Sequence, residues 1–488
     1  MTNLAGHDME AVLEAFHSVT DDRPQCFIAY TIKGHGTPLA GHRDNHAGLM
    51  NLEQMDIFRS KMQIPEGSEW SAYDNLLIEP ETAKNFCLQA PFNNRPPQET
   101  EPPKIKIPDN LPLNFRSSTS TQASFGNILN ELSRGNTDLA SRIVTTSHDV
   151  TVSTNLGPWV NQRGVFSLDV RNDVFRDEKV ASAQKWLRHG TGQHFELGIA
   201  ENNLFIMLAA LGLSGPLFGT RLLPIGTLYD PFIARGLDSL NYACYQDARF
   251  MLVATPAGIT LAPEGGAHQS ISSPLIGIGQ PGLSSYEPAY ADELAVIMRW
   301  AFEYMQAEKG GSIYLRLSTR AIDQPSREMK PELENQIIKG AYWHIPPTDG
   351  ARIAIVYSGA VVPEVIEAYE QLKEEIPELG IMAITSYDRL YHDWQRSQVE
   401  NIEGRNNIDC HIINLLAPLH SNAILITVQD AHPATLSWLG SATGRKLLPL
   451  GVTEFGQSGN IRDLYRQYGI GADAIIDAAA RASIKHSN

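Results

Sequence analysis

The sequence predicts an α/β fold of consecutive doubly wound sheets. Two observations predict it: strand-like and helix-like segments alternate between about residues 116 and 330, and again between 336 and 488. Such alternation is typical of a mostly parallel sheet with helices on both faces. No window approaches the roughly 18 consecutive apolar residues that a membrane-spanning helix needs.

Each element follows from its apolar pattern. In the first alternation, strands are expected at 143–146, 250–254 and 312–317, with helices over 204–213 and 292–305. In the second, strands are expected at 351–357, 380–385 and 423–428, with an amphipathic helix over 362–375.

The first part of the chain, residues 1–115, is less regular. One buried strand is expected at 27–32, followed by a glycine-rich turn. The stretch 89–114 is rich in Pro, Glu and Asn, which predicts an extended, solvated linker.

Composition narrows the function classes. The net charge of -16 disfavours nucleic acid and anionic membranes as partners. The four cysteines (Cys26, Cys87, Cys244 and Cys410) form no C-x-x-C pair, which argues against disulfides or a zinc site and suits a reducing cytoplasm. The N-terminal residues lack the basic flank and apolar core of a signal peptide. We therefore expect a cytoplasmic protein.

The segment 194–203 (HFELGIAENN) places an acidic residue, Glu201, directly before the apolar stretch 204–213. A carboxylate at the start of a buried helix is costly unless it is paired, and burial should raise its pKa. Glu201 is therefore either an anion at a helix N-terminus, which is common, or a proton-handling acid.

Two further segments carry candidate polar residues. The loop 260–270 (TLAPEGGAHQS) combines two glycines, which let a backbone approach a ligand, with His268, a potential acid or hydrogen-bond donor. A loop histidine is also often a plain surface residue. Asp149 lies at the end of the expected strand 143–146, where ligand sites of α/β proteins lie, although it could instead cap a helix.

A histidine-rich stretch lies near the N-terminus. His35, His42 and His46 fall within twelve residues, together with Asp44. Their spacing fits no standard metal-ligand pattern, so no metal site is expected there.

These motifs resemble those of the transketolase-like thiamine diphosphate enzymes. The segment FELGIAENNL (195–204) is similar to the motif that presents a glutamate to the cofactor's aminopyrimidine ring. The resemblance implies that Glu201 protonates this ring and drives its imino tautomer, which deprotonates the thiazolium carbon. The EGGAHQ loop is similar to the family's acidic-Gly-x-x-His-Gln loop. It implies that His268 hydrogen-bonds the substrate carbonyl or enamine oxygen, with Glu264 as a nearby polar contact.

The resemblance also assigns weaker candidates. Asp149 matches a Ser-x-Asp segment near the cofactor, and either Tyr229 or Phe232 would stack on the aminopyrimidine, unless both are ordinary core residues. The segment IAYTIKGHG (28–36) resembles the last strand of the family's diphosphate-binding domain. The loop after it would line the substrate channel, with His46 as the best candidate for a catalytic role and His35 and His42 below it.

Two relatives compete within this superfamily: transketolase, and the homodimeric first component of the pyruvate dehydrogenase complex. The segments 285–298 (SYEPAYADELAVIM) and 454–459 (EFGQSG) resemble the latter. Transketolase needs groups for a sugar phosphate, yet Pro256 falls where an upstream histidine would be expected, and only Arg320 and Ser153 remain as candidates. This favours a short 2-oxo acid such as pyruvate.

The largest departure from the family is an absence. The Gly-Asp-Gly segment that binds Mg²⁺ and the diphosphate in this family does not occur in the chain. We therefore expect 1–115 to be the remnant of the diphosphate-binding domain plus a linker, 116–330 the pyrimidine-binding domain and 336–488 a transketolase C-terminal-like domain.

Another chain would then supply the Mg²⁺ and diphosphate ligands, either in a homodimer or in a heteromer, and other subunits of a 2-oxo acid dehydrogenase complex are further candidate partners. The chain is expected to be half of a split enzyme, a truncated product, or a non-catalytic dimerising remnant. A nicotinamide-dependent oxidoreductase is disfavoured, because no G-x-G-x-x-G follows a strand with an acidic residue downstream.

Overall fold

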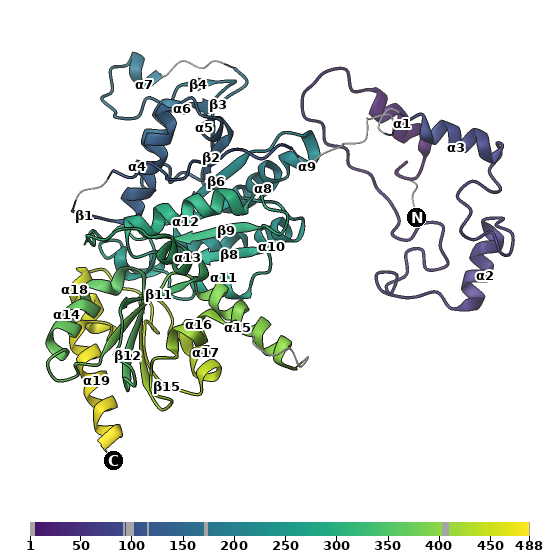
Figure 1. Ribbon diagram of the computed structural model, residues 1–488. Helices are drawn as coiled ribbons and strands as arrows, with labels where there is room; N and C mark the ends of the chain where they lie inside the picture. The colour runs from purple at the N-terminus through teal and green to yellow at the C-terminus, as the bar shows by residue number, and fades with distance from the viewer. Residues whose placement is uncertain are drawn as a thin grey trace. The chain divides into compact units, whose positions relative to one another are not determined.

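The computed structural model describes residues 5–90, 93, 102–114, 117–169, 174–402 and 409–487 (Figure 1). The chain divides into two compact units, Met1–Glu99 and Thr100–Asn488. Within the described residues, every helix is too short or too polar to cross a membrane.

The first unit contains three short helices and little core. The helices are α1 (Met9–His17), α2 (Leu52–Lys61) and α3 (Pro80–Leu88). Of its described residues only Ala83 is buried. The strand expected at 27–32 is not formed, and this prediction is wrong. A strand needs a hydrogen-bonded neighbour and a face to bury, whereas Ile28 is 80% and Tyr30 is 65% exposed.

The second unit begins with an eight-stranded sheet in the order β4-β3-β5-β2-β6-β7-β9-β8, and every pairing in it is parallel. Its strands are β2 (Ile143–Ser147), β3 (Val165–Phe166), β4 (Arg188–His189), β5 (His194–Glu196), β6 (Leu223–Leu228), β7 (Met251–Ala254), β8 (Leu283–Tyr286) and β9 (Ser312–Arg316). A two-residue strand β1 (Ser118–Thr119) pairs with β10 (Ile322–Asp323).

Helices cover both faces of this sheet. They are α4 (Thr121–Arg134), α5 (Asp138–Arg142), α6 (Gly157–Arg163), α7 (Val174–Asp177), α8 (Glu201–Gly212), α9 (Ser214–Phe218), α10 (Leu237–Tyr245), α11 (Ser273–Gly279) and α12 (Ala291–Tyr304), with short 3₁₀ helices η1 (Asp230–Gly236), η2 (Gly258–Thr260) and η3 (Gly266–His268). Alternate residues of β7 pack on opposite faces: Met251 and Val253 against α4, α6 and α12, Leu252 and Ala254 against α8 and α10.

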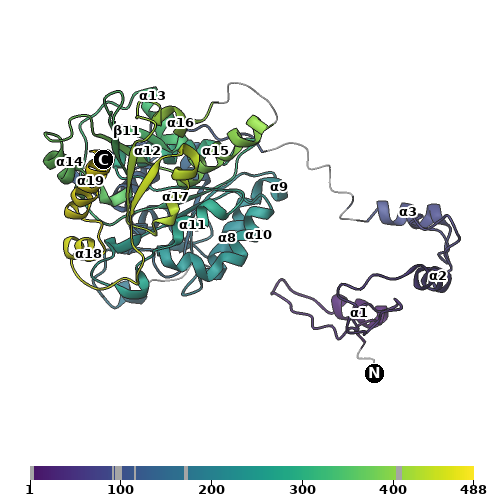
Figure 2. The same ribbon diagram turned by 90° about the horizontal axis from the view of Figure 1, so that it is seen from below.

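A second sheet follows in the order β11-β13-β12-β14-β15, parallel except for the pairing of β11. Its strands are β11 (Ala341–Ile345), β12 (Ile353–Ser358), β13 (Gly380–Ile384), β14 (Ile424–Gln429) and β15 (Lys446–Leu450). Its helices are α13 (Pro331–Lys339), η4 (Gly359–Val361), α14 (Val362–Leu372), α15 (Tyr387–Ile402), α16 (His411–Leu416), α17 (Ala434–Thr443), α18 (Ile461–Gln467) and α19 (Ala472–Ser487). Helices α14 and α19 lie side by side on one face, with α16 and α17 on the other (Figure 1 and Figure 2).

The expected α/β class with parallel sheets is confirmed, and each strand expected within 143–428 is formed. The separation into domains at 116–330 and 336–488 stays a prediction, since one buried apolar cluster runs through both sheets.

Two local expectations hold only in part. The expected linker is solvated only in part over 102–114: residues 103, 104, 106, 108–110 and 114 are exposed, whereas Ile105 and Leu111 are buried and the Ile105 N–H donates to the Gln306 side chain at 2.7 Å. Residues 91, 92 and 94–101 of that linker lie outside the described residues. Helix α8 forms, but it is buried on one face only, because Ile206 on the other face is 53% exposed.

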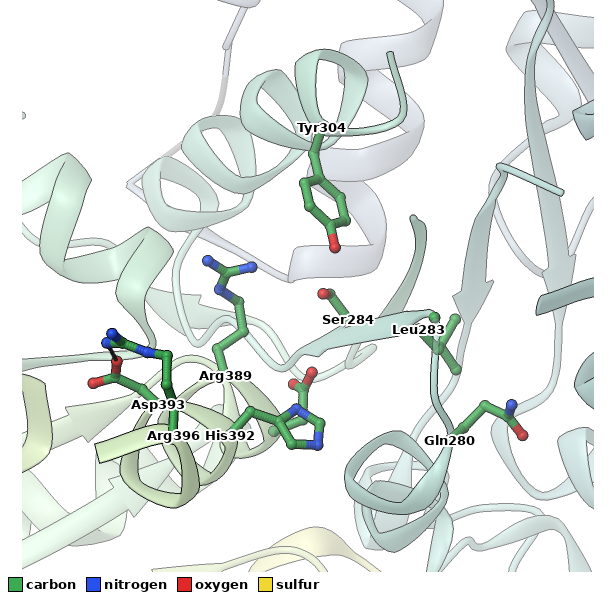
Figure 3. Close-up of a pocket in the computed structure, with 10 residues that line it drawn as sticks. Gln280, Leu283, Ser284, Tyr304, Arg389, His392, Asp393 and Arg396 are labelled. Atoms are coloured by element: carbon green, nitrogen blue, oxygen red, sulfur yellow. Dashed lines mark hydrogen bonds and ion pairs between the residues drawn. The ribbon is translucent and has the colours of Figure 1, made fainter. Parts of the chain in front are cut away.

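A cavity of about 340 Å³ lies between β8, α12 and α15. Ser284 from β8, Tyr304 from α12 and Arg389 from α15 point into it, with His392 beside them (Figure 3). None of the residues predicted from sequence to bind cofactor or substrate lines this cavity.

The two sheets are joined by a buried carboxylate at the end of β14. Asp430 accepts hydrogen bonds from the Ile259 N–H and the Tyr465 hydroxyl, each at 2.9 Å. Gly258 permits this approach, because a Cβ on it would lie 2.5 Å from a carboxylate oxygen of Asp430. Burial raises the pKa of Asp430 to about 6, although Arg316 opposes the shift.

The raised pKa predicts that the ionisation of Asp430 lowers the stability of the folded protein as pH rises. The folded state binds a proton at Asp430 more tightly than the unfolded state, so its contribution to stability is present at low pH and is lost as pH rises toward 6. In Asp430→Asn this loss is absent, so the wild type should become less stable relative to the variant by up to roughly 3 kcal/mol between about pH 4 and pH 6.5. Urea unfolding across this range measures the difference. The exposed Asp349→Asn is the control, and a difference that does not change with pH would contradict the prediction.

Candidate functional site

A buried carboxylate anchors the segment that follows β6. Asp230, the first residue of η1, has no exposed surface. It accepts hydrogen bonds from the hydroxyls of Ser270, Ser273 (2.6 Å) and Tyr314, and from Nε of Arg316 at 2.8 Å. Arg316 is itself buried, so its charge is stabilised inside the protein only by such partners.

This one carboxylate fixes two candidate segments. Phe232 follows Asp230 by two residues in η1, and His268 precedes Ser270 by two residues in the glycine-rich loop. Glu287 also accepts from Arg316, at 2.6 Å, and burial raises the pKa of Glu287 although Arg316 opposes this shift. The aromatic segment and the histidine loop are therefore tied to the same buried ionic centre.

Glu201 is the first residue of α8, which follows β5. Its side chain is 11% exposed, accepts a hydrogen bond from Nη1 of Arg235, and lies 4.0 Å from Nε2 of His148. Burial by itself would raise the pKa of Glu201, but its own backbone N–H and the guanidinium of Arg235 outweigh burial, so the pKa is lowered. The expected raised pKa is wrong for this reason.

His148 directly follows β2 and was not singled out from the sequence. It is 2% exposed, and neither ring nitrogen has a hydrogen-bond partner in the described part of the chain. Burial lowers the pKa of His148, which keeps the ring neutral with one donor and one acceptor. Buried polar atoms without partners are rare in folded proteins and need an explanation. The sequence offered one feature that could have singled out His148: its position just after the strand expected at 143–146.

Phe232 is the centre of an aromatic group. Its ring centroid lies 5.8 Å from that of Tyr229, 5.5 Å from His268 and 6.4 Å from His148. The guanidinium carbon of Arg235 lies 3.8 Å from the same centroid. Both Tyr229 and Phe232 are partly exposed, and Phe232 also packs against the apolar cluster that includes Leu204 and Phe205, so which of the two rings would stack on a cofactor stays a prediction. The structure thus brings together Glu201, His268 and the pair Tyr229 and Phe232, which were predicted from three separate segments of the sequence.

The turn that carries His148 is held by a hydrogen-bond network. His194 is fully buried and contacts Thr145 at 2.9 Å, and Thr151 and Glu196 at 3.2 Å each. Glu196 also accepts from the Asp149 N–H at 2.9 Å. Asp149 has a φ of 68° and an exposed side chain in this turn, so its proposed role near a cofactor stays a prediction.

Three other predicted residues have contacts of their own. Arg320 donates to both carboxylate oxygens of Glu364 at 2.7 Å. Glu264 is exposed, and its carbonyl accepts from Ser458. The hydroxyl of Ser153 donates to the Val150 carbonyl. Their roles toward a substrate stay predictions.

The three predicted histidines of the first unit lie in its irregular segments. His35 stacks on His7 with ring centroids 3.8 Å apart, and His46 lies 2.7 Å from the Lys33 ammonium. His42 accepts a hydrogen bond from the Asp44 N–H. The roles of these histidines toward a substrate stay predictions.

Comparison with known proteins shows which enzymes the chain is similar to. A family model described as the pyruvate dehydrogenase E1 component middle domain matches residues 115–323. The pyruvate dehydrogenase E1 component of Escherichia coli (strain K12) is 25% identical over 98% of this chain and 56% of its own length. That of Mycobacterium tuberculosis is 25% identical over 81% and 45%. The chain therefore spans about half the length of these curated relatives.

Solved structures agree on the fold. A transketolase from Campylobacter jejuni matches with a TM-score of 0.67 at 16% identity, covering 97% of this chain and 66% of the transketolase. A structure titled as a split gene transketolase, inactive beta4 tetramer, matches with a TM-score of 0.50 at 18% identity, covering 75% of this chain and 98% of the other. Both likenesses concern the fold alone. The sequence matches show that the chain is similar to pyruvate dehydrogenase E1 components, and the solved structures show that its fold is similar to that of transketolases.

The anchoring role of Asp230 can be tested by Asp230→Asn. An amide would place two donors among the hydroxyls and the guanidinium that now donate to the carboxylate, so we expect a loss of about 3 kcal/mol or more in the free energy of unfolding. Hydrogen exchange should also become faster in 229–236 and 266–270. The exposed Asp238→Asn should change stability by less than about 0.5 kcal/mol. Unchanged exchange in both segments would show that Asp230 does not hold them.

Proposed function

We propose that this chain supplies the glutamate side of a thiamine diphosphate-dependent site that decarboxylates a 2-oxo acid such as pyruvate, and that another chain supplies the Mg²⁺ and diphosphate ligands. The observation that carries the proposal is the grouping of Glu201, the unpartnered His148 and the ring of Phe232. They follow β5, β2 and β6, three adjacent parallel strands, and the carboxyl ends of such strands are where α/β proteins bind ligands.

The residues fit the aminopyrimidine end of the cofactor. Glu201 has a carboxyl group that can exchange a proton with a ring nitrogen, Phe232 has a partly exposed aromatic face, and His148 has buried ring nitrogens without partners. When bound, the cofactor would supply an electron sink for the bond next to the substrate carbonyl.

The chain's own residues would then handle protons and charge. Glu201 would share a proton with a ring nitrogen of the pyrimidine at its carboxylate. His268, which is held against Phe232, would donate a hydrogen bond to the oxygen on which negative charge develops. His46, with His35 and His42, would line the approach of the substrate.

The surface around Glu201 supports completion of the site by another chain. Large apolar side chains are exposed on and around α8, namely Ile199 (81%), Ile206 (53%), Phe218 (77%), Tyr242 (57%) and Tyr245 (85%). Exposed apolar residues that are grouped in this way mark surfaces for another protein. The occupant could be a second copy of this chain or a different chain.

A 2-oxo acid is favoured over a sugar phosphate by two observations. The sequence relatives are pyruvate dehydrogenase E1 components, and Arg320, a candidate for a phosphate, is already engaged by Glu364. Ketol transfer remains the alternative reaction, and Ser153 would then be the remaining candidate for contacting the phosphate of a sugar phosphate. A non-catalytic assembly is a second alternative, favoured by the likeness to a chain whose title calls it an inactive beta4 tetramer.

The glutamate assignment predicts the behaviour of Glu201→Gln. In the completed enzyme, with thiamine diphosphate, Mg²⁺ and pyruvate, this change should reduce turnover at least a hundredfold, because an amide cannot take up or release the proton. The fold should persist, since the amide keeps the shape of the side chain. Decarboxylation is measured as release of carbon dioxide, and folding as the thermal midpoint.

The matched control is Glu308→Gln, an exposed residue outside the Glu201 group, which should retain full turnover. Full activity of Glu201→Gln would refute the assignment. If the wild type turns over a ketose phosphate and not pyruvate, the substrate class is wrong although the site is right.

A further inference from the structure

We infer that Arg235 is an internal occupant of the aminopyrimidine position, which the cofactor must displace before Glu201 can act. The inference rests on the proposed function. Its basis is that Arg235 satisfies, from within this chain, the same two groups that the proposal assigns to the cofactor ring.

The geometry of Arg235 is that of a bound planar ligand. Its guanidinium carbon lies 3.8 Å from the ring centroid of Phe232, and its Nη1 donates to the carboxylate of Glu201. A guanidinium is flat, offers N–H donors along its edge and stacks on aromatic rings. An aminopyrimidine ring likewise has a stacking face and an edge of nitrogen atoms, and its ring nitrogen can donate to Glu201 once that nitrogen is protonated. The two groups therefore cannot use Phe232 and Glu201 at the same time.

Arg235 can leave this position without disturbing the core. Its side chain is 54% exposed, so the guanidinium can move into water, whereas Asp230 at the other end of η1 is fully buried. The next residue, Gly236, lets η1 lie closely on α8, since a Cβ there would be 2.1 Å from the ring of Phe205. Close packing of η1 on α8 brings Arg235 over the first residue of that helix.

Displacement of Arg235 would change the proton affinity of Glu201. The hydrogen bond and charge of Arg235 lower the pKa of Glu201, while burial raises it. When the guanidinium leaves, the raising effect of burial is opposed by fewer groups. Glu201 then binds a proton more readily, which is what proton exchange with a pyrimidine nitrogen requires. Arg235 thus holds the pKa of Glu201 down until a ligand takes its place.

The test uses the pyrimidine half of the cofactor, 4-amino-5-hydroxymethyl-2-methylpyrimidine, as a probe. Its dissociation constant is measured by calorimetry for the full wild-type chain, for Arg235→Ala and for Arg235→Gln, with thermal midpoints as the check on folding. We expect both variants to bind the probe at least tenfold more tightly than the wild type, because no internal group has to be displaced. The control is Arg462→Ala. Arg462 lies in α18, beside the second sheet, and its side chain is 78% exposed, so this variant should bind the probe as tightly as the wild type does.

The outcomes separate this inference from the proposed function. If Glu201→Gln weakens probe binding but the Arg235 variants bind no more tightly than the wild type, the pyrimidine site stands and the occupant role of Arg235 is overturned. If no chain binds the probe, or if Glu201→Gln binds it as the wild type does, both the proposed function and the inference fail. If Arg235→Ala does not fold, the dissociation constant of the probe for Arg235→Gln alone tests whether Arg235 is the internal occupant.

Discussion

The buried contact between Asp230 and Arg316 is the interaction on which the candidate site depends. Neither charge is tolerated alone in a protein interior, so each requires the other in place. Asp230 lies after β6, Arg316 ends β9, and Ser270 links the histidine loop to the same carboxylate. Arg316 also donates to the Asp430 carbonyl, which joins the second sheet. One ionic centre therefore sets the relative positions of segments that are far apart in the sequence.

The short helix η1 combines a fixed end with an exchangeable one. Asp230 is buried among four donors, whereas Arg235 reaches from the other end of η1 to Glu201 across the face of Phe232. Fixation at one end allows a side chain at the other end to exchange partners without loss of the fold. We infer that Asp230 fixes the position of η1, and that Arg235 at its other end controls access to Glu201.

Much of the fold was predictable from sequence because it follows from local apolar patterns. The parallel strands at 143–146 and 250–254 were predicted in this way, and local motifs predicted Glu201, His268 and either Tyr229 or Phe232, whose side chains the structure groups together although their roles stay predictions. Contacts between distant residues were not predictable. Arg235 lies 34 residues from Glu201 and reverses the expected direction of its pKa shift. The strand expected at 27–32 failed for the converse reason: an apolar run is not a strand without a neighbour to pair with.

We propose that this chain holds the pyrimidine side of a cofactor site whose diphosphate side comes from another chain. The decisive measurement is calorimetric titration of thiamine diphosphate with Mg²⁺, using the purified chain alone and then the chain mixed with a candidate partner that carries the missing Gly-Asp-Gly segment. Tight binding is expected only in the mixture. Equally tight binding by the chain alone would contradict the division between two chains, and no binding in the mixture would contradict the cofactor site itself.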